Sequence, residues 1–60
     1  MNLVFALENG KYIKEFEEAD IHPIIGETVI VDKTRIKYIV KDILGDYQAN
    51  ATICYLEKKN

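Results

Sequence analysis

The apolar positions on either side of an Asn-Gly pair near the start of the chain match one another, which predicts a β-hairpin. Asn9-Gly10 is the dipeptide that best supplies the two positive-φ residues of a type I′ turn. If these two residues form the loop, one face of the ribbon is apolar except for Lys14, which faces Phe5. The apolar members of that face are Leu3, Phe5, Leu7, Tyr12 and Phe16. Burial of one such face normally sets the register of a hairpin.

A short helix is the alternative for residues 12–20. Lysine, glutamate, phenylalanine and alanine are acceptable helix formers, and Ile13, Phe16 and Asp20 would share one helical face. That face ends in an acid after only two apolar residues, so its amphipathic pattern is poor. We therefore expect the hairpin, and keep an α+β fold with a helix at about 12–20 as the alternative.

His22-Pro23 interrupts the pattern, because proline lacks an amide donor and restricts the residue before it. We expect a turn or the start of an edge strand there, with Ile24 and Ile25 folding back over the core. After a turn at Gly26, residues 27–32 are typical of a short buried strand centred on Val29–Val31.

Residues 33–44 alternate with a period of two, which predicts a half-buried strand. Its apolar side carries Thr34, Ile36, Tyr38 and Val40, and its basic side carries Lys33, Arg35, Lys37 and Lys41. The alternation fails at Asp42, where Ile43 and Leu44 restart it out of phase. A slip of one residue within a strand indicates a bulge or a sharp bend. Gly45-Asp46 is a turn signal.

The last apolar run, Thr52–Leu56, does not alternate, which is typical of a strand covered on both faces. Residues 57–60 are expected to be a solvated tail. Five short strands with a bend in the fourth predict an all-β fold, a single small five-stranded barrel, closed or half-closed, over residues 1–60. Closure would protect the strand edges of so small a sheet.

Composition supports this fold class and narrows the function. Of 60 residues, 16 are isoleucine, valine or threonine, which favour the pleated sheet. The net charge is −2; residues 1–30 carry six acids and two lysines (−4), and residues 31–60 carry four acids and six bases (+2). The overall sign argues against non-specific nucleic-acid binding. No stretch resembles a signal peptide or a membrane span, so we expect a cytoplasmic protein without membrane contact.

Two segments resemble a known family. Pro23–Val31, with its Pro-x-x-Gly-Glu-x-Val pattern, and Tyr38–Ile43, with Tyr-x-Val-x-Asp-Ile, are similar to small SH3-like barrels of phages and prophages of Gram-positive bacteria. The resemblance implies the SH3-like barrel fold and a non-enzymatic role. Peptide-binding SH3 domains use a tryptophan for proline-rich ligands, and this chain has none.

No set of residues predicts catalysis, a cofactor or a metal. Cys54 paired with His22 would be a nucleophile, but a lone cysteine between apolar neighbours is typical of a small buried residue. His22 with nearby acids matches no known metal-ligand spacing. The chain has no serine, and its three glycines are isolated, so it has no serine nucleophile and no phosphate-binding loop.

Two charged stretches are candidate binding faces. The acidic face, Glu15, Glu17, Glu18 and Asp20, either occupies a basic groove on a partner or simply keeps the domain soluble. The basic face, Lys33, Arg35, Lys37 and Lys41, either follows a phosphate backbone or guards a strand edge.

Together these features predict a non-catalytic protein-interaction module, a phage or prophage accessory protein. We expect a protein partner, and the opposite charges of the two halves also allow a homo-oligomer. The alternative is a nucleic-acid-binding barrel that uses the basic face.

Overall fold

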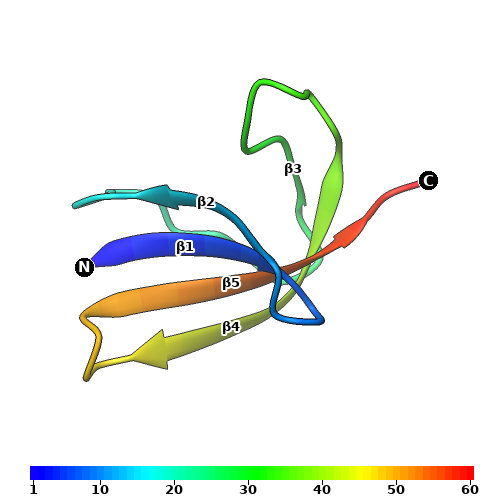
Figure 1. The fold of residues 1–60 in the computed structure, drawn as a ribbon. Coiled ribbons are helices and arrows are strands. Elements are labelled where there is room, and N and C mark those ends of the chain that lie inside the picture. The colour runs from blue at the N-terminus through cyan, green and yellow to red at the C-terminus, as the bar shows by residue number, and fades with distance from the viewer.

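The computed structural model describes all 60 residues and contains five β-strands and no helix. The strands are β1 (Asn2–Leu7), β2 (Tyr12–Phe16), β3 (Thr28–Val29), β4 (Tyr38–Asp46) and β5 (Ala51–Lys58). They form one sheet in the order β2-β1-β5-β4-β3, which curls into a half-barrel (Figure 1). The predicted all-β fold of five strands is confirmed. The alternative helix at 12–20 is wrong, because its first five residues are strand β2.

The first and last strands lie side by side and parallel at the centre of the sheet (Figure 1). Val4 is opposite Ile53 and Ala6 is opposite Tyr55, and the Asn2 N–H donates to the Asn50 carbonyl, at 3.0 Å, where this pair begins. The other three pairings are antiparallel. The non-alternating run Thr52–Leu56 predicted a covered strand, but nothing in the sequence pattern specifies that β5 pairs with β1.

The predicted hairpin forms, with Leu3 opposite Phe16 and Phe5 opposite Lys14. The type I′ turn does not form. The Gly10 N–H donates to the Leu7 carbonyl at 2.8 Å, and the Leu7 N–H donates to the Lys11 carbonyl at 2.8 Å. These bonds enclose a three-residue loop in which only the glycine has a positive φ, 91°. The Asn9 side chain stabilises this loop by accepting the Lys11 N–H at 2.9 Å.

The longer loop shifts the register near the turn. The pairing is irregular between Phe5 and Ala6, so that Ala6, and not Leu7, is opposite Tyr12. Tyr12 is therefore 60% exposed, and its predicted place on the buried face is wrong. Ile13, the additional residue at this irregularity, packs against the core in its place.

The glycine of this turn provides a test of the loop geometry. Gly10→Ala is expected to lower the free energy of unfolding by about 1–2 kcal/mol, because a Cβ disfavours the left-handed region. Gly45 has no positive φ, and an added Cβ would lie 3.6 Å from the Tyr47 ring, an ordinary contact. Gly45→Ala should therefore leave stability unchanged or raise it by about 0.5 kcal/mol. Urea unfolding of the two variants measures both effects, and equal losses would contradict the turn described here.

The phase slip predicted in the fourth strand is confirmed as a bulge. The register of β4 against β5 shifts between Val40 and Asp42, so that Lys41 is the additional residue. The strand begins only at Tyr38, so the predicted strand over residues 33–37 is wrong. The Asp32 carboxylate accepts both the N–H, at 3.0 Å, and the hydroxyl of Thr34, and thereby closes a turn where the alternation predicted extended chain.

The other boundaries differ in smaller ways. The predicted strand over 27–32 is reduced to Thr28–Val29, and Gly45-Asp46 belongs to β4, because the turn follows at residues 47–50. The first two residues of the expected tail, 57 and 58, belong to β5. No strand forms at His22-Pro23.

Seven buried side chains form the core inside the curled sheet: Leu3, Phe5, Val31, Tyr38, Val40, Cys54 and Leu56. The rings of Phe5 and Phe16 meet edge to face with centroids 6.0 Å apart. Ile24 and Ile25 do not cover this core as predicted, since they are 68% and 61% exposed. They lie at a turn whose next residues are tied to β4 through the Gly26 N–H and the Glu27 carbonyl, so the isoleucines are left in solvent.

Candidate functional site

The two central strands are apolar on both of their faces. In β1, Leu3 and Phe5 belong to the core cluster, whereas Val4 and Ala6, which each follow one of them in the strand, do not. In β5, the core residues Cys54 and Leu56 alternate in the same way with Ile53 and Tyr55. Because successive side chains of a strand point to opposite sides, the second set forms a face of the sheet turned away from the core.

The strand register extends this second face over four strands. One row runs from Val4 through Ile53 to Leu44, and the next runs from Tyr12 through Ala6 to Tyr55. Leu44 is 49% exposed and Tyr12 60%, whereas Val4, Ile53 and Tyr55 between them are half-buried and Ala6 is buried. We call this surface the outer face; its residues are Val4, Ala6, Tyr12, Leu44, Ile53 and Tyr55.

Acidic residues surround the outer face. Glu15 is opposite Val4 at one end of the first row, and Asp42 is opposite Tyr55 at the end of the second. Asp46 pairs with Ala51 beside them. A shallow hollow of about 350 Å³ next to Tyr55 is lined by Glu8 and Asp42 as well. In the strand register no lysine or arginine is paired with an outer-face residue, and the residues paired at its edge include Glu15 and Asp42.

A second surface lies where the half-barrel stays open. Strands β2 and β3 are the two ends of the sheet, and a groove of about 460 Å³ lies between β2 and the segment that follows β3. We call it the seam groove; it is lined by Lys14, Phe16, Ile30, Val31, Asp32, Lys33 and Arg35. The Lys14 ammonium lies 5.8 Å from the centroid of the Phe16 ring, within the range of a cation–π contact.

The structure divides the four predicted basic residues. Lys33 and Arg35 line the seam groove, whereas Lys37 and Lys41 do not. A single basic strand therefore does not exist, because Lys33, Arg35 and Lys37 all precede β4. The third cation of the groove is Lys14. In the sequence this residue stands out only as the one polar member of the apolar hairpin face.

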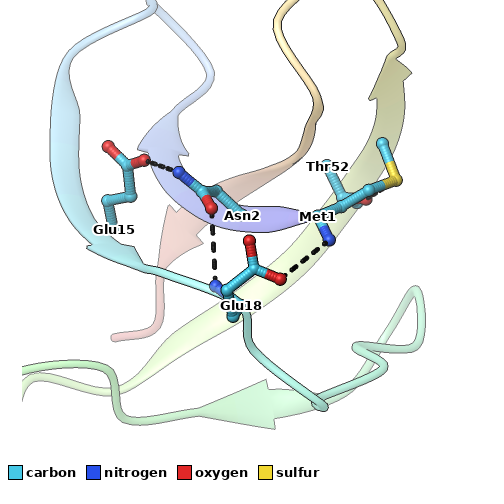
Figure 2. Close-up of polar contacts among 5 residues, drawn as sticks. All are labelled: Met1, Asn2, Glu15, Glu18 and Thr52. Carbon is cyan, nitrogen blue, oxygen red and sulfur yellow. Dashed lines mark hydrogen bonds and ion pairs between the residues drawn. The ribbon is translucent and has the colours of Figure 1, made fainter.

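Two of the four predicted acidic residues, Glu15 and Glu18, make polar contacts with the start of β1 (Figure 2). The Glu17 side chain is exposed and makes no hydrogen bond or ion pair. The Asn2 amide donates to the Glu15 carboxylate at 2.7 Å, and its oxygen accepts the Glu18 N–H at 3.4 Å. The Glu18 carboxylate lies 3.9 Å from the terminal amine of Met1. Asp20 pairs instead with His22 at 3.4 Å. Two of these acids thus hold the end of β2 against the start of β1, beside the Met1–Thr52 contact.

Cys54 is the small buried residue that its neighbours in the sequence favoured. It is 0% exposed and its thiol is free. Burial, followed by the charge of Glu27, raises the pKa of this thiol to about 11, so the thiol stays protonated at neutral pH. His22, its candidate partner, is exposed and pairs with Asp20. No group of three or more histidine, cysteine or acidic side chains is placed to hold a metal ion.

The outer face and the seam groove are therefore the candidate sites of this molecule. The fold includes no helix with the length and apolar character needed to span a bilayer. Comparisons of the chain with protein-family models, with curated proteins and with solved structures found no match.

Proposed function

We propose that this protein is a non-catalytic protein-interaction module that binds its partner through the outer face. The observation that supports this is the composition of β1 and β5, which are apolar on both faces although the core cluster lies on one of them. On the other face Val4, Ile53 and Tyr55 remain partly exposed. Strands of this kind occur where both faces of a sheet are covered. An apolar patch rimmed by polar residues is typical of a protein–protein interface.

The rim indicates the chemistry of the partner. Glu15, Asp42 and Asp46 are complementary to a surface that places lysine or arginine around an apolar centre. A second copy docked through the same face would oppose these acids to one another, which is unfavourable. We therefore propose a different protein as the partner. The resemblance to phage and prophage barrels supports the further proposal that the protein is an accessory protein of such an element, acting in the cytoplasm.

Light scattering tests the choice between a different partner and a second copy. We expect the purified protein to have a mass near 6.9 kDa at micromolar concentration. The homo-oligomer expected from the sequence would need a contact between two different surfaces, with the outer face of one copy against the seam groove of the next. Particles larger than 6.9 kDa that dissociate in about 0.5 M salt would support such an electrostatic contact and contradict a monomer.

Affinity capture with matched variants tests the docking face. Leu44→Lys places a cation on the outer face between Asp42 and Asp46. This cation would repel a basic partner, and it adds no further negative charge to the rim. Ile24→Lys is the control, because Ile24 is 68% exposed and lies outside this face. Proteins retained from nuclease-treated lysate by wild type and by Ile24→Lys should be lost with Leu44→Lys. Equal retention by all three, or loss of every protein after nuclease, would contradict the proposal.

A further inference from the structure

The seam groove combines an open strand edge with unpaired positive charge. Strand β2 has a neighbour, β1, on one side only, so the backbone groups on its other side have no partner in the sheet. The groove borders this strand through Lys14 and Phe16. An exposed edge with a groove alongside it is the arrangement to which an extended peptide adds as a further strand.

Three cations line this groove, and none has an acidic partner. The Met1–Glu18 ion pair and the Asp20–His22 contact involve none of Lys14, Lys33 and Arg35. The only acid in the groove, Asp32, is bonded to the N–H and hydroxyl of Thr34. The positive charge of the groove is therefore available to a ligand.

The floor of the groove is apolar. Val31 is buried, Ile30 is 40% exposed and the Phe16 ring is half-buried. A ligand that fits must supply carboxylates or phosphates toward the three cations, apolar groups toward this floor, and hydrogen-bonding groups toward the edge of β2. An extended peptide with alternating acidic and apolar residues has all three, because alternate side chains point to opposite sides and successive backbone groups lie along its edges.

We infer that the seam groove binds an extended acidic peptide segment of a partner protein, which adds to the free edge of β2 between Lys14 and the segment 30–35. A single-stranded nucleic acid fits less well. The groove offers only one aromatic ring on which a base could stack, and a nucleic acid has no backbone amides to pair with the strand edge. The chain also has a net charge of −2, which repels phosphates. The site is distinct from the outer face, because Lys14 and Phe16 lie opposite the core residues Phe5 and Leu3.

NMR titration with defined probes tests this inference. The probe is a short peptide of alternating valine and glutamate, with the valine–glutamine peptide as the neutral control and oligo-deoxythymidine as the nucleic-acid probe. We expect the acidic peptide to shift amide signals of residues 12–16 and 30–35, and to slow hydrogen exchange in β2. The same peptide N-methylated at alternate residues should not bind, because it cannot pair with the strand edge.

Matched variants test whether the three cations of the seam groove bind the peptide. The combined change Lys14→Gln, Lys33→Gln and Arg35→Gln should weaken peptide binding about tenfold, since each exposed ion pair contributes modestly. Lys37→Gln with Lys41→Gln is the control outside the groove and should not change it. Arg35→Gly removes one cation without loss of fold, because the φ of 62° at this position suits glycine.

Each remaining outcome overturns the inference. Binding of oligo-deoxythymidine but not of the peptide would make the groove a nucleic-acid site. Binding of the N-methylated peptide would show that the strand edge is not used, and no binding of any probe would mean that the lysines only protect the edge. Leu44→Lys should leave the titration unchanged, so failure here is separable from failure of the outer face as a docking site.

Discussion

Phe5→Ala is expected to lower the free energy of unfolding by about 3–5 kcal/mol, the largest effect of any single change in this chain. Phe5 is 4% exposed, lies in a central strand and meets Phe16 edge to face at 6.0 Å. A domain of this size has about 3–9 kcal/mol of stability in all. The loss is therefore a large part of the whole stability, and we expect a steep fall in the urea midpoint of Phe5→Ala at 25 °C, measured by urea titration monitored with far-UV circular dichroism.

Tyr12→Ala is the matched control, because it also removes an aromatic ring from the same hairpin. The two-residue loop expected from Asn9-Gly10 would bury this ring beside Leu7, and Tyr12→Ala would then also cost several kcal/mol. In the observed register the ring is 60% exposed, so we expect a loss of about 0.5 kcal/mol or less. Comparable losses in Phe5→Ala and Tyr12→Ala would support the two-residue loop and contradict the register described here.

The second large effect is a loss of stability at alkaline pH that depends on Cys54. Burial raises the pKa of this thiol from 9.0 to about 11 in the folded protein. Above pH 9.0 the unfolded chain loses the proton while the folded chain keeps it, so deprotonation favours unfolding. The contribution is fully present below pH 9.0 and is lost as the pH rises to about 11, by about 2–3 kcal/mol in all.

Urea unfolding of wild type and Cys54→Ala across this range measures the effect. Tyrosines and lysines titrate in both proteins, so only the difference between the two curves reports on the thiol. The cavity left in Cys54→Ala adds an offset that does not vary with pH. We expect the two free energies of unfolding to converge as the pH rises, and parallel curves would show that the thiol ionises as readily in the folded protein as in the unfolded chain.

The two surfaces have opposite charge and lie on opposite sides of the β1–β2 hairpin. Glu15 belongs to the rim of the outer face, and its neighbours Lys14 and Phe16 line the seam groove. A single edge strand thus contributes to both surfaces, because its side chains alternate between them. The proposed module can therefore hold a basic partner surface and an acidic peptide segment at the same time.

Local patterns determined several features of this protein. The non-alternating run Thr52–Leu56 predicted that β5 is covered on both faces, because a strand apolar on both faces belongs in the middle of a sheet. The phase slip at Asp42 predicted the bulge at Lys41, since one additional residue inverts the side-chain alternation. The hairpin at residues 2–16 and the buried, unreactive position of Cys54 were also evident at this level.

Contacts between distant segments decided the strand pairing and the positions of the basic residues. The parallel pairing of β1 with β5 joins residues some fifty positions apart, and no short-range periodicity specifies a partner at that distance. The basic pattern at 33–37 predicted a strand, but Asp32 closes a turn on Thr34, and Lys33 and Arg35 face Lys14 across the open seam. Alternation records which side of a strand is apolar, and only the folded sheet determines which of those sides faces the core and which stays partly exposed.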